Sequence, residues 1–299
     1  MRIFQFFFLL VLISAAPASL QAESHSPEVK QNQQIIWGRT DFAPFFIQKG
    51  DHSNQGISDN IIRFFSDNIT GYQHVSAEMS LKRLLQNAEQ GVPICHVVLL
   101  KTSEREKFID YSAPYMFNYA NGIVTSEEGL KRIGLSVDNI QPVDLSQLLD
   151  KPLRISAHDG RSYSPEIDSI IAENRDQPNS IFQMKSGLKE LDRLVKLVAH
   201  NRLDGLLARP EEAQFIKTEY GIEAPLYFVK INNSPSISKV HVGCAKGEWN
   251  DELFRQIAEL VQTREALQVI EASYSQWLPA HLKGHYSKVI STMHAANEP

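Results

Sequence analysis

Apolar positions along the chain follow helix spacing and strand spacing in alternation. Leu81, Leu84, Leu85 and Ala88 are three or four residues apart, between Ser80, a residue type that caps helices, and Gly91. The next segment, 94–100, is almost continuously apolar, which is typical of a strand covered on both faces. Because strand patterns and helix patterns continue to alternate, the chain is predicted to be an α/β protein with largely parallel sheets.

The alternation falls into two clusters, 35–118 and 150–220, and this grouping predicts two sheets. The first cluster opens with a strand pattern over 35–47 and a helix capped by Ser58 or Asp59. The second predicts the following elements: strands at 153–156 and 203–207, and helices that begin at Ser164-Pro165, Ser186 and Pro210. The C-terminal part predicts a strand near 240–245 and helices over about 250–262 and 264–276.

The first 22 residues have the pattern of a cleavable signal peptide. Arg2 precedes an apolar core, Phe6 to Ile13, and small residues follow, with candidate cleavage sites after Ala18 and Ala22. This core is shorter than the roughly 20 apolar residues that span a bilayer. We therefore expect an exported, periplasmic protein, and the alternative is an uncleaved membrane anchor.

Composition removes several classes of function. The chain is 42% apolar and 22% charged, with a net charge of -5, which is ordinary for a globular protein and argues against a nucleic-acid surface. Without Arg2, 29 basic residues remain against 35 acidic ones, so the mature chain carries -6. The sequence lacks the G-x-S-x-G, P-loop, G-x-G-x-x-G and H-E-x-x-H motifs. We therefore expect no enzyme activity, no cofactor and no metal site; His281 and His285 are expected to be exposed.

The two cysteines, Cys95 and Cys244, would meet an oxidising compartment after export. They are either joined in a disulfide bond or buried separately as small apolar residues.

One segment carries a recognisable combination of motifs. The apolar strand pattern ends in Thr102-x-x-Arg105, and Tyr111-Ser112-x-Pro114-Tyr115 begins six residues after Arg105. At this point the chain resembles the extracellular solute-binding protein family 3, which comprises amino-acid-binding type II periplasmic binding proteins. The resemblance extends over about 35–280, which includes Phe42-Ala43-Pro44-Phe45 and Leu203-Asp204-Gly205.

The resemblance implies a two-lobed α/β fold with a hinge and a cleft between the lobes. It implies this organisation: lobe I over 35–119 plus 243–285, lobe II over 120–242, crossings near 118–124 and 239–244, and a C-terminal tail over 286–299. Both cysteines would then lie in or beside lobe I, which implies a Cys95–Cys244 disulfide.

The resemblance also implies a ligand site in the cleft. Arg105 offers a planar guanidinium that can hold a carboxylate through two hydrogen bonds. The other candidate ligand-binding residues are Thr102 and Tyr115 in the motif, Phe42 and Phe45 as an apolar wall, and Arg161 and Ser162 before a helix start that favours anions. The alternatives are an ion pair of Arg105 with Glu104 or Asp110, a solvated loop at Arg161 and core packing of Phe42.

Arg209 departs from the family pattern. Amino-acid binders of the family place an Asp there to hold the ammonium group of the ligand, and a cation cannot do this. Val98 and Leu100 likewise stand where the family often has hydroxyl residues. Arg105, Arg161 and Arg209 together would suit a ligand with more than one negative charge, or an aromatic acid. The alternative is an ion pair of Arg209 with Glu211 or Glu212.

The resemblance therefore predicts a monomeric periplasmic protein that captures a small, acidic, carboxylate-bearing solute for an ABC-type membrane permease. A sensing module that reports to a membrane receptor is the first alternative. An enzyme on the same scaffold is the second.

Overall fold

The computed structural model describes residues 33–158, 161–174, 183–185 and 190–295 of the 299-residue chain. The expected signal peptide, 1–22, and the expected helix cap at Ser186 lie outside the described residues. Within these ranges, no helix has the length and apolarity that crossing a membrane requires.

The first sheet has five strands in the order β2-β1-β3-β12-β4. β1 is parallel to β2 and β3, whereas β12 is antiparallel to β3 and β4. The strands of this sheet have the following bounds: β1 Gln33–Arg39, β2 Tyr72–Glu78, β3 Ile94–His96, β4 Ile109–Tyr111 and β12 Gly243–Ala245.

The second sheet also has five strands, in the order β10-β6-β9-β7-β8. β7 is parallel to β8 and β9, and β6 is antiparallel to β9 and β10. Its strands have the following bounds: β6 Gly122–Thr125, β7 Ile155–His158, β8 Gln183–Lys185, β9 Gly205–Ala208 and β10 Tyr227–Val229.

The prediction of two sheets is confirmed, but the prediction of largely parallel sheets is wrong. A helical crossover returns the chain to its sheet in the same direction and gives a parallel pair. β6 and β12 instead enter their sheets directly from the other half of the molecule, and both run against their neighbours.

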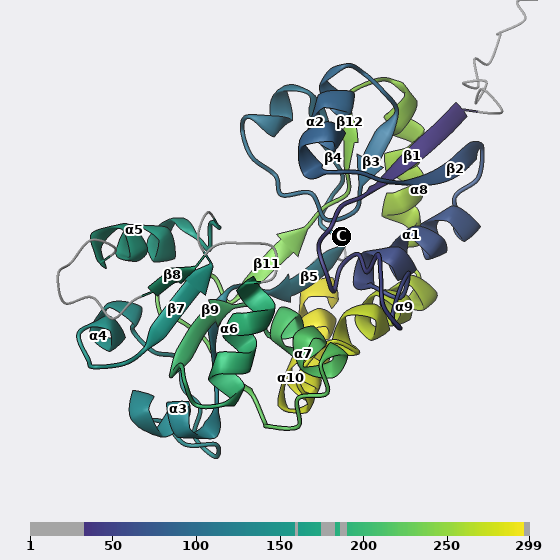
Figure 1. Ribbon diagram of the computed structural model, residues 1–299. Coiled ribbons are helices and arrows are strands. Elements are labelled where there is room, and N and C mark those ends of the chain that lie inside the picture. Colours follow the sequence, from purple (N-terminus) through teal and green to yellow (C-terminus); the bar gives the residue numbers. More distant parts are fainter. Residues whose placement is uncertain (1–32, 159–160, 175–182, 186–189, 296–299) are drawn as a thin grey trace, which may run out of the picture.

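A two-stranded ribbon connects the sheets. β5 (Met116–Tyr119) and β11 (Ile237–Val240) pair antiparallel, with Tyr119 opposite Ile237. β5 leads into β6 of the second sheet. β11 leads into β12 of the first sheet (Figure 1). The chain thus passes between the sheets twice, side by side; the lobe limits and the hinge remain predictions.

Helices cover both sheets. Those that follow strands of the first sheet are α1 Ile57–Asn68, α2 Leu81–Glu89, α8 Trp249–Leu260, α9 Arg264–Ser275 and α10 Ala280–Ala295. Those associated with the second sheet are α3 Glu127–Ile133, α4 Leu145–Leu149, α5 Pro165–Asn174, α6 Glu190–Ala199 and α7 Pro210–Glu219. Ser80 caps α2 as predicted, whereas α1 begins earlier than predicted, after Gly56.

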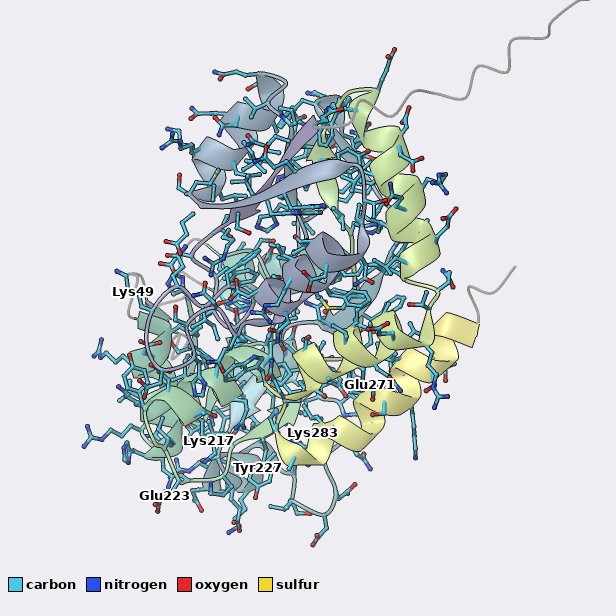
Figure 2. All side chains as sticks on the ribbon, turned by 90° about the vertical axis from the view of Figure 1, so that its right-hand side faces the viewer. Lys49, Lys217, Glu223, Tyr227, Glu271 and Lys283 are labelled. Carbon is cyan, nitrogen blue, oxygen red and sulfur yellow. A yellow bond between two sulfur atoms is a disulfide. The ribbon has the colours of Figure 1, made fainter. Side chains whose placement is uncertain are left out.

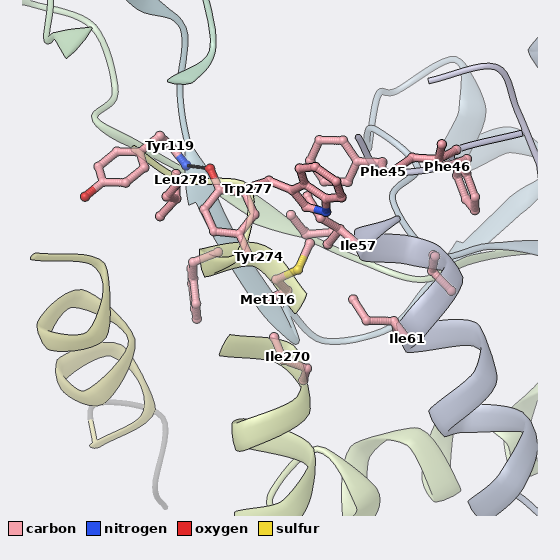
Figure 3. Packing of buried hydrophobic residues seen from close by; sticks show 14 of the residues in the cluster. Phe45, Phe46, Ile57, Ile61, Met116, Tyr119, Ile270, Tyr274, Trp277 and Leu278 are labelled. Carbon is pink, nitrogen blue, oxygen red and sulfur yellow. Dashed lines mark hydrogen bonds between the residues drawn. The ribbon is translucent and has the colours of Figure 1, made fainter. Parts of the chain in front are cut away.

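The C-terminal helices close the core beside the ribbon. α9 packs on α1, and Tyr274 of α9 lies fully buried next to Tyr119, whose N–H donates to its hydroxyl at 2.8 Å (Figure 3). α9 and α10 lie alongside each other; Glu271 and Lys283 mark them in Figure 2.

The expected C-terminal tail is corrected by this structure, because α10 continues through residue 295. Tyr286 and Ile290, four residues apart, lie on its buried face, at 0% and 4% exposure. The Tyr286 hydroxyl also donates to the Phe117 carbonyl at 2.7 Å. An apolar helical face with an anchored tyrosine therefore covers the ribbon where sequence analysis expected a tail.

The expected disulfide is confirmed. Cys95 of β3 and Cys244 of β12 stand directly opposite each other in the antiparallel register and are bonded. The bond joins positions 149 residues apart inside the first sheet.

Candidate ligand site in the cleft between the sheets

A cavity of about 550 Å³ lies where the two halves of the molecule and the ribbon meet. Its wall comes from the loop after β1, the start of α2, the segment from His96 to Arg105, the ribbon, and Arg209 at the start of α7. Of the eight predicted ligand residues, four line it: Phe42, Phe45, Arg105 and Arg209. Loops at strand ends and residues before helices thus converge on one concave site.

Phe42 and Phe45 form an aromatic platform on one side of the cavity. Their rings stack with centroids 4.8 Å apart and planes 12° apart. Phe45 is 1% exposed, whereas Phe42 is half-buried and keeps a ring surface toward the cavity. Phe42 therefore packs against the core, as the alternative expected, and also borders the cavity; its contact with a solute stays a prediction.

A buried carboxylate holds the loop that carries the platform. Asp59 of α1 accepts hydrogen bonds from the backbone N–H groups of Ile47 and Gly56, each at 3.1 Å. The Nε of Arg39 donates to the other oxygen of the same carboxylate at 2.9 Å. Because its oxygens are satisfied in this way, the buried charge fixes the loop at both of its ends.

Arg105 opens a short 3₁₀ turn, Arg105–Lys107, on the opposite side. Its Nη1 donates to the Leu100 carbonyl at 2.8 Å, and no salt bridge joins it to a carboxylate among the described residues. The alternative partners are engaged elsewhere: Glu104 pairs with Lys107 at 2.6 Å, and Asp110 accepts from Asn250. The guanidinium thus borders the cavity with its charge uncompensated by those two acids.

Arg209 precedes α7, and its guanidinium carbon lies 5.8 Å from the centroid of the Phe42 ring. Its Nε is buried without a hydrogen-bond partner among the described residues. The expected alternative, an ion pair with Glu211 or Glu212, is not found there, because Glu212 pairs with Arg161 at 2.9 Å. Glu212 also accepts a hydrogen bond from the backbone N–H of Arg209, at 3.0 Å, but not from its guanidinium.

Glu211 is fully buried behind Arg209. The Tyr274 hydroxyl donates to its Oε2 at 2.8 Å, and its Oε1 has no partner among the described residues. Burial raises the pKa of the Glu211 carboxyl to about 7, although the nearby Arg209 charge lowers it. A buried carboxyl that titrates near neutrality therefore lies between α7, α9 and the ribbon.

Sequence analysis missed His96, Thr40 and Asn118 of the cavity wall. Burial, with the Arg105 charge beside it, lowers the pKa of His96 to about 3, so its ring is neutral. Its Nδ1 accepts from the Val98 N–H at 3.2 Å, so its Nε2 carries the proton and donates to Thr40 Oγ1, also 3.2 Å away. The Thr40 hydroxyl proton is consequently available as a donor.

Asn118 is 4% exposed and lies on β5 of the ribbon, and its Oδ1 lacks a partner in the described part of the chain. A polar residue inside the apolar segment Met116–Tyr119 is the sequence signal that would have indicated it.

Four predicted residues do not line the cavity. Arg161 donates to Glu212 and to Asn121 Oδ1 at 3.0 Å, which fastens its loop to α7. Ser162 donates to Asp168 at 2.6 Å, and Asp168 also accepts the Tyr163 N–H at 2.8 Å. The helix start expected to attract an anion is thus supplied with a carboxylate of its own helix.

Thr102 and Tyr115 do not line the cavity but form hydrogen bonds with the backbone of its wall. Thr102 Oγ1 accepts from the Arg105 N–H at 3.4 Å, so it shapes the turn that presents Arg105. Tyr115 is 1% exposed, packs on Phe65 and donates to the Val97 carbonyl at 2.6 Å. In the matched motif, these residues hold the backbone around the cavity wall.

A metal site has no support in the described ranges. The structure has no group there of three or more His, Cys, Asp or Glu side chains that could hold an ion. His281 and His285 lie exposed on α10, as expected.

No protein-family model matches the chain, and no curated protein matches it either. Several solved structures are similar to the chain. An ancestral cationic amino acid solute-binding protein is 15% identical with a TM-score of 0.60, covering 83% of this chain and 96% of its own. The periplasmic VFT2 domain of BvgS from Bordetella pertussis is 19% identical with a TM-score of 0.54, covering 83% and 94%.

An amino acid ABC transporter substrate-binding protein from Streptococcus pneumoniae, bound to L-arginine, is 18% identical with a TM-score of 0.52, covering 83% and 94%. Identities this low establish a common fold. The chain has the two-lobed α/β fold of the type II periplasmic solute-binding proteins.

Proposed function

We propose that this protein is a periplasmic solute-binding protein that captures a small carboxylate-bearing solute for ABC-type uptake. The observation that carries the proposal is the cavity between the two halves of the molecule, bordered by the Arg105 guanidinium. Its volume of about 550 Å³ falls in the range of small-molecule sites, about 300–1,000 Å³.

The wall suits an organic acid with an apolar body. Arg105 supplies the planar cation that matches a carboxylate, and the Phe42–Phe45 platform supplies apolar contact area. Leu81 and Leu100, 40% and 68% exposed, continue this apolar surface along the cavity. A solute that covers them replaces water on apolar surface, which adds to the charge interaction.

Capture would proceed by closure of the lobes about the β5–β11 ribbon, because the cavity takes its wall from both sides of that ribbon. The closed form of the monomer, held by solute, would be the form that a membrane permease recognises. The role is binding without turnover, and incubation with a bound acid followed by mass spectrometry should return the acid unchanged.

Thermal-shift measurements with a panel of carboxylic acids test the site. We expect stabilisation of the wild-type protein that is lost in Arg105→Ala and weakened in Arg105→Lys, which keeps the charge without the fork. Arg264→Ala, at an exposed position on α9, is the matched control and should respond like wild type. An acid that stabilises wild type and Arg105→Ala equally would refute the role of Arg105.

Sensing is the second candidate function, and the fold shared with the BvgS periplasmic domain favours it. In that case the same cavity would bind the acid, and a membrane receptor would read the closed form. Deletion of the gene in its source organism separates the two: uptake of the bound acid falls if the protein serves a permease and stays intact if it serves a receptor.

A further inference from the structure

We propose, on the basis of the binding function above, that Arg209 binds a second anionic group of the solute. The cavity would then select diacids with an apolar body over α-amino acids. It would also couple their capture to the uptake of a proton by Glu211.

The charges of the described lining residues are the first support. Three cationic side chains, Arg105, Arg209 and Lys239, line the cavity, and Asp41 is the single carboxylate among the described residues of its wall. His96 is neutral. The wall therefore carries a net charge of plus two, which a dianion compensates and a zwitterion does not. An ammonium group would add to the excess of positive charge.

The surroundings of Arg209 are the second support. The two acids nearest in sequence are engaged by Arg161 and by Tyr274, so neither forms an ion pair with the Arg209 guanidinium. Its buried Nε therefore keeps an unused N–H donor, which is costly unless a partner fills the position. Closure of the lobes around a solute carboxylate would bring an acceptor to this guanidinium.

The Phe42 ring is the third support, because it connects the anion to an apolar body. The Arg209 guanidinium carbon lies 5.8 Å from this ring, and Phe42 stacks on Phe45. A solute that places one carboxylate at Arg209 consequently lays its adjoining carbons on the aromatic platform. Arg105 and Arg209 come from different halves of the molecule, so a diacid that reaches both joins the lobes.

Binding of an anion at Arg209 should be accompanied by protonation of Glu211. The groups that face this carboxyl are Glu212 on its own helix, Arg209 directly before that helix, Arg161, Tyr274 of α9, Tyr286 of α10 and Tyr119 of β5. Two cations act on this carboxyl. Arg161 is paired with Glu212, whereas the Arg209 charge lowers the pKa of Glu211 and favours its ionised form. When a solute carboxylate neutralises Arg209, the pKa of Glu211 rises further and the carboxyl takes up a proton.

Isothermal titration calorimetry with matched probes tests the proposal: benzoate, the three benzenedicarboxylates and L-phenylalanine. We expect at least one dicarboxylate to bind more tightly than both benzoate and L-phenylalanine. Arg209→Ala should weaken that dicarboxylate by about ten- to a hundredfold, the usual value of a charged hydrogen bond, and benzoate by less than about threefold. Arg202→Ala, exposed in the same half of the molecule, is the control and should bind like wild type.

The pH profile is the second readout. Between pH 7 and pH 8.5 the Kd of the dicarboxylate should rise by up to about tenfold per pH unit, because proton uptake becomes harder. Glu211→Gln should flatten this profile without abolishing binding. A wild-type Kd that is independent of pH in this range overturns the coupling.

Three other outcomes overturn the proposal. They are tighter binding of L-phenylalanine than of every dicarboxylate, equal dicarboxylate affinity in wild type and Arg209→Ala, and a failure of all three dicarboxylates to bind. The proposed function stands independently if benzoate or L-phenylalanine binds and loses affinity in Arg105→Ala, so the two failures are distinguishable.

Discussion

Two buried carboxylates show how partners decide the behaviour of a single residue. Asp59 receives two backbone N–H donors and the Arg39 Nε, and its charge holds the loop that carries Phe42 and Phe45. Glu211 receives one hydroxyl, and its Oε1 has no partner in the described part of the chain. Asp59 therefore anchors the loop through its hydrogen bonds. Burial without sufficient partners raises the pKa of Glu211 and favours its protonated form.

Glu211 should make stability depend on pH. Its folded pKa of about 7 lies above the value of about 4.3–4.5 for an unfolded glutamate, so between these pH values only the folded state holds the proton. Stability therefore falls as pH rises through this window, by about 3 kcal/mol for an isolated group. Above the folded pKa it stays constant.

Urea unfolding of wild type and Glu211→Gln at pH 4 and pH 8 measures this term. Wild type should lose about 3 kcal/mol relative to the variant between the two pH values. Parallel pH dependence of the two proteins would contradict a raised pKa for this group.

At the scale of elements, the ribbon and α10 depend on each other. Among the described strands, β5 and β11 pair only with each other, and α10 covers β5, where the Tyr286 hydroxyl donates to the Phe117 carbonyl. Tyr274 of α9 adds its contact with the Tyr119 N–H (Figure 3). The C-terminal helices therefore hold one strand of the connection between the halves of the molecule.

Removal of the Tyr286 side chain should expose this dependence. Tyr286→Ala leaves a cavity beside the ribbon and removes the hydrogen bond to the Phe117 carbonyl, so we expect a loss of about 3–5 kcal/mol in urea unfolding, as for large aromatic residues in cores. Lys283→Ala, exposed on the same helix, should stay within about 0.5 kcal/mol of wild type. A small effect of Tyr286→Ala would show that α10 does not stabilise the ribbon.

At the scale of the whole molecule, the disulfide joins the strand before the chain crosses to the second sheet to the strand after it returns. β3 precedes the first crossing and β12 follows the second, and Cys95–Cys244 joins them inside the first sheet. The bond thereby restricts the unfolded chain over 149 residues of separation. Since loop closure costs more entropy for longer loops, this bond is well placed to stabilise the fold.

Reduction measures that contribution. In the chain-entropy account a loop of this length is worth about 5 kcal/mol, so unfolding in urea with dithiothreitol should occur with a free energy lower by about that amount. The strand pairing around the bond should persist, with an unchanged far-ultraviolet circular dichroism spectrum below the transition. A loss under about 1 kcal/mol would indicate that the unfolded chain is already compact without the bond.

Much of the fold was predictable because its signals are local. Helix spacing at Leu81–Ala88, the Ser80 cap and the Ser164-Pro165 start each depend on neighbouring residues, and they were found as predicted. Strand direction was not predictable in this way, because β6 and β12 take theirs from the crossings. The site was half predictable: Arg105 and Phe42 lie in a recognisable pattern, whereas Asn118 and Thr40 reach the cavity from a ribbon and a loop end.

By itself the sequence determined an α/β chain in two clusters, the Thr102-x-x-Arg105 turn and a pair of cysteines whose bonding followed from the resemblance. Only the tertiary structure decided which charges meet. In the fold, Glu212 forms an ion pair with Arg161, and Glu211 accepts a hydrogen bond from Tyr274. Arg209 therefore lies at the cavity with an Nε–H donor that has no partner among the described residues. The reason is physical: backbone preference and apolar spacing act between neighbours in the chain, whereas the partner of a charge is set by which side chains the packed elements bring within about 3 Å.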